Sequence, residues 1–551
     1  MARFVTLLAL AVCFVHSQGV ARVLNFTKAG RDVTAEWQKA TSGLTERDTL
    51  KVCFGSGKYY LSGTVEMLCN VAVIGKGASK STLVCRADSR FTDDCFIKAA
   101  GHRTRTIAVD VSNVGINLEK HNGMLWDINS AKYLLKIYHA NRVSVKGCSS
   151  YIDNASCTNV NIRNSSNVNV CSCKFINYNN CRTGGILWFT GDAQNVLVEG
   201  NDFKKSGNDE TVAFFGTWGD AWNPSYKAAL SVKKNISVSG NSFYLESGNN
   251  GYNVPMTMFF SLYNHEGAKR SEIAAKVDGF RVNNNKIVVA GDVRCLFFVQ
   301  KEQNTTSKNV SFTQNNIKML ETASTEVGSR SLFSIVDYSH GEDAYEISGN
   351  VIDNKSVVIN GGYNYNYLLD VDGAKIDFSG NKMASVVHAD KRGCGVTAIN
   401  AYGYGGVVNM RNNSLSGLHK LSNLSVSGNE TIEHVSILAE NNKFKGNTTI
   451  YCNNISRLDL KFVGNEFYSL NWEYFLQEFA KTGTLIFKNN VVRAENGGGG
   501  LLAHYAASQV GSMYFENVEV SSNIFKGVKT ANLLENMVKV KSKKVSGNKF
   551  Y

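Results

Sequence analysis

The hexapeptide VSGNSF at Val238–Phe243 decides the fold, because close variants of it recur through the rest of the chain. VSGNETI occupies Val426–Ile432, and the sequence closes on VSGNKF followed by one tyrosine. Aligned, the copies give an apolar residue, two variable residues, asparagine, one variable residue and a second apolar residue. A phrase that returns in this way indicates a repeat protein.

Asparagine is the residue that recurs most consistently in the repeated phrase. Two earlier copies have cysteine in its place, at Cys148 and Cys173. From Asn442 to Asn465 and on to Asn490 the steps are 23 and 25 residues, whereas the steps from Asn201 to Asn413 run from 30 to 44, as if loops were inserted into a basic unit. The asparagines are Asn201, Asn241, Asn285, Asn315, Asn350, Asn381, Asn413, Asn429, Asn442, Asn465, Asn490, Asn523 and Asn548.

A coil of short strands explains this repetition. Stacked coils place equivalent positions about 4.8 Å apart, and a buried asparagine amide can both donate to and accept from the asparagines above and below it. A glycine or asparagine just before it tolerates the left-handed backbone of a tight corner. The phrase is therefore predicted to be one corner of a solenoid, with its apolar residues in the core.

Composition agrees with a single elongated domain. The 551 residues are 43% apolar and 11% aromatic, and two prolines leave no Pro-rich linker to divide the chain. Short runs of Val, Ile, Phe and Tyr alternate with polar residues, which indicates β structure.

This pattern resembles the right-handed parallel β-helix of the pectate-lyase-like superfamily, in which asparagine ladders line a turn. DVTAEWQKATSGL, with Asp32 as a possible N-cap, reads as that fold's capping helix. The resemblance implies an all-β right-handed parallel β-helix solenoid of about 15 coils, roughly 70 Å long at about 4.8 Å per coil. It covers residues 25–551 and is weak for activity, because the G-H-G and R-I-K motifs of polygalacturonases are absent.

The N-terminus reads as a secretory signal. Its apolar run, Phe4–Val15, is too short to span a bilayer, and Val15 and Ser17 suit a cleavage site before Gln18. The alternative is an uncleaved apolar arm that packs into a larger assembly. We expect a signal peptide over residues 1–17, an N-terminal cap region over 18–45 and the β-helix over 46–551, in a secreted or cell-surface protein with no transmembrane segment.

The longest steps of the repeat hold the first candidate site. Tryptophan rings stack on sugar faces and carboxylates perform acid/base chemistry. We expect Asp192, Asp209 and Glu210 to be catalytic, and Trp188, Trp218, Asp220 and Trp222 to bind substrate. The alternative is that the tryptophans pack loops onto the solenoid while the acids are solvated.

Two further features bear on chemistry. HADKRG supplies Lys391 and Arg392, which could bind an acidic substrate and stabilise the charge formed in a lyase reaction. Asp370 and Asp372 in LLDVDG could form a Ca²⁺ pair, although a turn in which each aspartate bonds its own backbone is the preferred interpretation. No other cofactor or metal is expected.

These observations predict a protein that binds, and could depolymerise, a polysaccharide as a lyase or glycoside hydrolase. The formal net charge of +13 favours an acidic glycan, and no nucleic-acid-binding module is recognisable. The alternative is a non-catalytic adhesin or a tailspike-like virion component, for which a homotrimer is one arrangement. A third interpretation is a solenoid that only spaces other parts of a surface.

Overall fold

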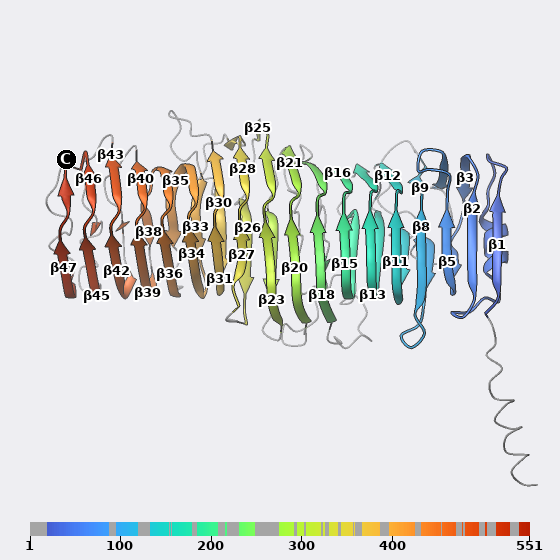
Figure 1. Cartoon of the computed structure of the whole chain (residues 1–551), viewed down its shortest axis with the longest axis horizontal. Coiled ribbons are helices and arrows are strands. Elements are labelled where there is room, and N and C mark those ends of the chain that lie inside the picture. Colours follow the sequence, from blue (N-terminus) through green and yellow to red (C-terminus); the bar gives the residue numbers. More distant parts are fainter. Residues whose placement is uncertain are drawn as a thin grey trace, which may run out of the picture.

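The computed structural model shows a long rod of stacked strands (Figure 1). The structure describes residues 19–86, 95–119, 133–153, 155, 157–178, 185–207, 215–216, 231–247, 275–290, 295–301, 305–320, 323–324, 330–339, 343–355, 357–358, 366–385, 396–424, 431–452, 454–469, 476–477, 480–494, 502–503, 514–528 and 539–551. Within this part of the chain each coil contributes strands to as many as three faces, here named A, B and C.

Face A is a column of parallel strands in which each pairs with the strand one coil later. Val196 lies beside Ile236, and Ile236 lies beside Phe280 in the next coil. The strands are β1 (Ala21–Phe26), β2 (Thr49–Phe54), β5 (Asn70–Ile74), β8 (Ile107–Ser112), β11 (Ala140–Lys146), β13 (Thr158–Cys171), β15 (Leu187–Glu199), β18 (Ser231–Ser239), β20 (Ala275–Asn283), β23 (Thr306–Thr313), β27 (Tyr345–Ser348), β31 (Ala374–Ser379), β34 (Gly405–Arg411), β36 (Ile432–Glu440), β39 (Ile455–Val463), β42 (Ala480–Lys488), β45 (Tyr514–Ser521) and β47 (Lys539–Ser546). These eighteen described strands exceed the expected 15 coils because β1, β2, β5 and β8 precede the first copy of the phrase.

Face B follows face A in each coil, directly after the phrase. Its strands are β3 (Gly57–Leu61), β6 (Ser81–Cys85), β9 (Gly115–Leu118), β12 (Ser149–Asp153), β14 (Lys174–Tyr178), β16 (Asp202–Gly207), β19 (Ser242–Ser247), β21 (Lys286–Ala290), β24 (Asn316–Met319), β28 (Val351–Asn354), β32 (Lys382–Ser385), β35 (Ser414–Leu424), β37 (Lys443–Gly446), β40 (Glu466–Ser469), β43 (Val491–Ala494), β46 (Ile524–Lys526) and β48 (Lys549–Phe550). They too pair in parallel, coil to coil.

Face C precedes face A in many coils and also includes the first halves of β13 and β15 and the second half of β35. A short parallel pair, β25 (Ala323–Ser324) and β29 (Val357–Val358), lies outside the three faces. The other strands of face C are β4 (Val65–Met67), β7 (Cys95–Ala100), β10 (Tyr133–Tyr138), β17 (Phe215–Gly216), β22 (Cys295–Lys301), β26 (Arg330–Asp337), β30 (Asn366–Asp372), β33 (Val396–Ala401), β38 (Ile450–Cys452), β41 (Leu476–Gln477) and β44 (Leu502–Ala503). Parallel strands stacked on successive faces define a parallel β-helix.

The core is a continuous apolar column inside the faces. Side chains alternate along each strand, so one set from every strand points inward and is buried. Phe175, Phe203 and Phe243 stack over one another, with ring centroids 5.4 and 4.9 Å apart. Burial of each phenylalanine side chain contributes about 1.5–3 kcal/mol to the stability of the fold. The apolar side chains stacked along the axis therefore hold successive coils together.

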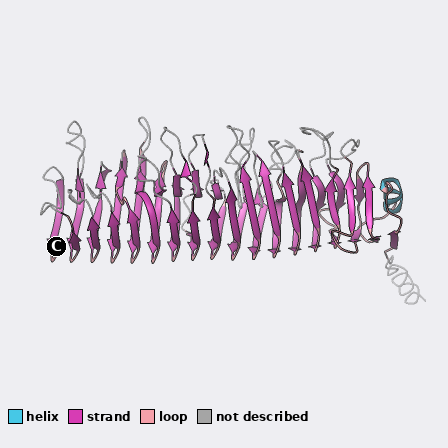
Figure 2. Cartoon of the chain, turned by 90° about the horizontal axis from the view of Figure 1, so that it is seen from above, coloured by secondary structure: helices cyan, strands magenta, loops and turns pink. Residues whose placement is uncertain are grey.

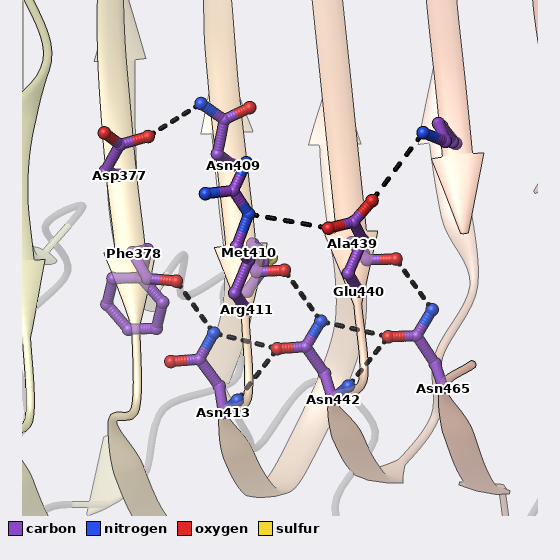
Figure 3. Close-up of polar contacts among 11 residues, drawn as sticks. Asp377, Phe378, Asn409, Met410, Arg411, Asn413, Ala439, Glu440, Asn442 and Asn465 are labelled. Carbon is purple, nitrogen blue, oxygen red and sulfur yellow. Dashed lines mark hydrogen bonds and ion pairs between the residues drawn. The ribbon is translucent and has the colours of Figure 1, made fainter. Parts of the chain in front are cut away.

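Asparagines line the corner between faces A and B. Asn413 donates its backbone N–H and its Nδ2 to Oδ1 of Asn442, at 2.9 and 2.8 Å, and Asn442 donates in the same way to Asn465, at 2.9 and 3.0 Å (Figure 3). The same bonds run from Asn201 to Asn548. We call this series the asparagine stack.

The copy of the phrase at Asn429 is not a member of the stack. Asn413 bonds directly to Asn442, which leaves no place for a rung between them. Asn429 itself lies outside the described residues. The prediction of a rung there was wrong because one copy of so short a phrase can occur by chance in an asparagine-rich chain.

Cys148 and Cys173 occupy the corner in the two coils before the stack begins. Cys173 donates its backbone N–H to Oδ1 of Asn201 at 2.9 Å, and the N–H of Cys148 points to Sγ of Cys173 at 3.4 Å. The residue before each rung has a positive φ, as at Ser172 (54°), Gly200 (62°) and Gln314 (55°). The left-handed corner expected from the sequence is therefore present, and it also accepts serine and glutamine.

The helix α2 (Thr34–Thr41) lies at the N-terminal end of the rod (Figure 2). Trp37 is fully buried and tilts against Phe26 and Phe54, with centroids 6.4 and 5.6 Å away. Asp32 accepts a hydrogen bond from the N–H of Thr34 at 2.8 Å. Strand β1, inside the segment expected to be a cap, pairs with β2 and so forms part of face A.

Candidate functional site

The outer surface of face C carries a row of polar side chains from four successive coils. Ser334 pairs with Asp370, Asp370 with Asn400, and Asn400 with Asn423. Their neighbours Phe333, Leu369 and Ile399 are fully buried; since strand side chains alternate, the polar residues point outward. We call these four residues the Asp370 row.

Hydrogen bonds connect the Asp370 row across the coils. Nδ2 of Asn400 donates to Oδ1 of Asp370 at 2.7 Å, and Oγ of Ser334 approaches Oδ2 at 3.5 Å. Nδ2 of Asn423 reaches Oδ1 of Asn400 at 3.5 Å. The row therefore presents a carboxylate and two amides in a line parallel to the rod axis, all half-buried except the buried Ser334.

Tyrosines and a second carboxylate lie to one side of the row, towards the C-terminal ends of its strands. Asp372, on the same strand, is only 5% exposed and accepts the N–H of Tyr404 at 2.8 Å. The rings of Tyr338 and Tyr404 meet edge to face, with centroids 6.5 Å apart. Burial, followed by the charges of Asp370 and Asp372, raises the pKa of Tyr402, so its phenol remains a hydrogen-bond donor at neutral pH.

At the C-terminal end of the row, in the coil that follows Asn423, lie an aromatic ring and two basic side chains near it. Tyr451 pairs with Asn423, and Nζ of Lys420 lies 4.7 Å from the centre of its ring. Burial, followed by the charge of Lys420, lowers the pKa of His419. The imidazole is therefore neutral at pH 7 and can both donate and accept a hydrogen bond.

This arrangement suits the recognition of hydroxyl groups. A row of carboxylate and amide groups can bond to sugar hydroxyls, while aromatic rings pack against apolar sugar faces. No group of three or more metal-ligating side chains occurs among the described residues. Asp370 and Asp372 lie on strand β30, not in the turn that the sequence favoured.

Asp192 has a structural role. Its Oδ1 accepts the N–H of Val232 at 2.7 Å, and its own N–H donates to Oδ1 of Asn164 at 3.0 Å. It thereby joins three coils at the bend inside β15. Aspartates at bends commonly bond backbone N–H groups, and Asp192 does so here.

Trp188 lies on the outer side of face C, half-buried, in the same strand as Asp192. Its ring meets Tyr133 edge to face, with centroids 6.3 Å apart. Gly185 lies directly below it, since a Cβ there would come within 1.9 Å of Nε1. The ring thus packs against the solenoid and remains partly exposed.

The remaining expected site residues lie outside the described residues. They are Asp209, Glu210, Trp218, Asp220, Trp222, Lys391 and Arg392.

Sequence reasoning missed the Asp370 row because the members have no constant offset from the repeated phrase. Asp370 precedes its rung Asn381 by 11 residues, whereas Ser334 precedes Asn350 by 16. The intervening loops differ in length, so only the pairing of strands aligns these side chains.

The similarity of the chain to known proteins is weak. No protein-family model and no curated protein matches the chain. Among solved structures, the chain is similar to a family 28 exopolygalacturonase of Yersinia enterocolitica, with 10% identity and a TM-score of 0.32 over 93% of this chain and 79% of that one. It is also similar to the catalytic domain of a GH87 alpha-1,3-glucanase in complex with nigerose, with 11% identity and a TM-score of 0.24 over 92% of this chain and 69% of that one.

The class of the protein follows from its own strand pairing: it is a parallel β-helix protein, as the resemblance in the sequence implied. No helix in the described part of the chain is long and apolar enough to cross a membrane.

Proposed function

We propose that this protein binds a polysaccharide along the outer surface of face C, with the Asp370 row as the polar floor of the site. The observation that carries the proposal is the line Ser334, Asp370, Asn400 and Asn423, which offers hydroxyl-binding groups at the coil repeat of about 4.8 Å. Tyr402 supplies a ring beside the row, and Tyr451 supplies one in the coil that follows Asn423.

A matched pair of variants tests this proposal. Asp370 on face C accepts Nδ2 of Asn400 at 2.7 Å, and Asp377 on face A of the same coil accepts Nδ2 of Asn409, also at 2.7 Å (Figure 3). Asp370→Asn should weaken binding on a glycan array by about tenfold or more, since hydrogen bonds to a charged group contribute about 1.5–3 kcal/mol. Asp377→Asn should leave binding unchanged. Equal effects of the two substitutions would contradict the placement.

Hydrolysis is the second candidate function. Asp370 and Asp372 are two residues apart on one strand, which separates their Cα atoms by about 6.6 Å, near the about 6.5–9.5 Å between the carboxyl groups of inverting glycosidases. The burial of Asp372 and its bond from Tyr404 favour binding over catalysis.

Incubation with acidic and neutral polysaccharides distinguishes the candidates. New reducing ends without ultraviolet absorbance indicate a hydrolase, and new ends with absorbance indicate a lyase. If Asp209→Ala abolishes cleavage and Asp370→Asn does not, the catalytic site is the first one expected from the sequence, which contains Asp209. Retention on the array without cleavage indicates an adhesin or a tailspike-like protein.

Export and assembly belong to the same proposal. N-terminal sequencing of the mature protein should find Gln18 first if the apolar run is a cleaved signal, and an intact N-terminus would favour a virion component. Sedimentation equilibrium tests the homotrimer.

A further inference from the structure

The outer surface of face B carries a line of cations along the rod. Eleven basic side chains of its described strands point outward, against five acidic ones, which are Asp153, Asp202, Glu246, Asp353 and Glu466. All eleven except the half-buried Lys204 are exposed. They are Lys58, Lys174, Lys204, Lys286, Lys318, Lys382, Lys443, Lys445, Arg493, Lys526 and Lys549.

Most of these cations have no carboxylate partner. Within the described part of face B, one ion pair occurs, between Lys443 and Glu466 at 3.4 Å. In the described part of the chain, Lys286 and Lys382 lie beside neutral residues in both neighbouring coils. Lys174 and Lys318 lie beside Asp202 and Asp353 but form no ion pair with them. Their charge is therefore available to a ligand.

On face A, several charged side chains form ion pairs between neighbouring coils. Glu440 lies between Arg411 at 3.5 Å and Lys461 at 3.6 Å. Lys544 pairs with Glu519 at 2.9 Å. Part of the charge on face A is thus neutralised by pairs across coils, whereas the described part of face B has one such pair.

The spacing of the cations follows the coils. Val351 pairs with both Asn316 and Lys382, and Asn316 pairs with Lys286, so Lys286 and Lys382 lie in one column three coils apart. This separates them by about 14 Å at about 4.8 Å per coil. Lys318, in the adjacent column of an intervening coil, lies between them along the axis. A straight ligand parallel to the axis could contact all three.

We propose that face B binds a linear anionic polysaccharide, carboxylated or sulfated, that lies along the rod axis. This surface is separate from the Asp370 row and does not depend on it. Attraction of this kind is long-ranged and is screened by salt, so affinity should fall steeply as ionic strength rises.

The aromatic side chains of this face favour a glycan over a nucleic acid. Single-stranded nucleic acids bind by stacking bases on open aromatic rings. Lys204 lies over the rings of both Tyr178 and Tyr244, at 5.3 and 5.0 Å from their centres. Arg493 lies 5.1 Å from the ring centre of Tyr468. These rings are occupied by cations of the protein itself.

Charge reversal on two faces of the same coils tests the inference. Lys286→Glu, Lys318→Glu and Lys382→Glu change face B, while Lys276→Glu, Lys308→Glu and Lys375→Glu change face A by the same net charge in the same coils. The probes are heparin, polygalacturonate, neutral dextran, a single-stranded oligonucleotide and vesicles containing phosphatidylserine. Binding is measured at several salt concentrations, and thermal unfolding verifies that each triple variant is folded.

The face B triple should weaken the binding of heparin or polygalacturonate about tenfold or more and reduce the salt dependence, because each lost cation removes one released counterion. The face A triple should leave both close to wild type. Three neutral Lys→Gln changes at the face B positions should give a smaller loss in the same direction. Asp370→Asn should not alter this binding, which separates this inference from the proposed function.

Equal losses in the two triple variants would overturn the inference, because they would trace binding to net charge alone. Tighter binding of the oligonucleotide or the vesicles, abolished by the face B triple, would assign the surface to another class of partner. Failure of heparin and polygalacturonate to bind the wild-type protein at physiological salt would also overturn it.

Discussion

Each asparagine of the stack before Asn548 joins three coils. Nδ2 of Asn381 donates to the carbonyl of Ile347 in the preceding coil at 2.8 Å and to Oδ1 of Asn413 in the next at 3.2 Å. Its Oδ1 accepts the backbone N–H and the Nδ2 of Asn350 at 3.0 and 2.9 Å. Because all these groups are buried, no shorter or apolar side chain satisfies them.

The carboxylate of Asp459, on face A, also accepts several hydrogen bonds. Burial raises the pKa of Asp459, but hydrogen bonds from Arg457, Thr484 and His434 outweigh it and hold the pKa below its usual value. The distances from Asp459 are 2.7 Å to Nε of Arg457, 2.9 Å to Thr484 and 3.0 Å to His434. A depressed folded pKa means that ionisation of this group stabilises the fold.

The stabilisation by Asp459 should depend on pH. It is fully present above the unfolded pKa of about 3.9 and is lost as the pH falls through the lower folded pKa. Asp459→Asn should therefore lower the urea midpoint at pH 7, and the difference from wild type should shrink as the pH falls below that range. A difference that stays constant down to pH 2 would show that the charge is irrelevant.

At the scale of strands, glycine permits one element to serve two faces. Strand β35 begins in face B and ends in face C, and Gly417 lies at the change with φ of +78°. A Cβ there would come within 2.2 Å of the carbonyl oxygen of Ser385. The close approach of the two coils, as well as the backbone conformation, requires glycine.

Two glycine substitutions separate these requirements. Gly200 also has a positive φ, +62°, but a Cβ there would have nothing within 4 Å. Gly200→Ala should cost about 1–2 kcal/mol from the left-handed conformation alone. Gly417→Ala should cost roughly twice that, because the coils must also separate. Urea unfolding of the two variants measures the difference, and equal costs would show that the coils adjust freely.

The strand pattern and the corners could be predicted from the sequence, and the candidate site could not. Phrases such as VSGNSF specify a corner locally, through a residue that tolerates positive φ and an asparagine. Asp370 and Asn400 are thirty residues apart in the sequence and become neighbours only because β30 pairs with β33. The loops between such strands differ in length from coil to coil, so the repeated phrase does not predict this pairing. The bond between Asp192 and Val232 could not be predicted either, because the two residues are 40 apart in the sequence.

At the scale of the whole molecule, the rod is a one-dimensional array. Each coil contacts mainly its neighbours, so stability is approximately a sum of coil terms and interface terms. Damage to one coil should therefore remain local, which differs from the global response of a compact domain.

Asn381→Ala tests this locality. Loss of the buried bonds should destabilise the surrounding coils by about 2–4 kcal/mol. Hydrogen exchange should accelerate in β28, β31 and β34 while β1, β2 and β5 keep wild-type rates. The exposed neighbour Lys382→Ala should change neither region by more than about 0.5 kcal/mol. Uniform acceleration along the rod would show that the solenoid unfolds as one unit.

The asparagine stack also has a direction. In every step the backbone N–H and Nδ2 of the earlier coil point to the Oδ1 of the later one, from Asn201 to Asn548. Aligned amide dipoles of this kind add, as they do along a helix. The solenoid therefore has an electrical polarity along its length, with the oxygen end of each amide towards the N-terminal coils, so its two ends differ in potential as well as in shape.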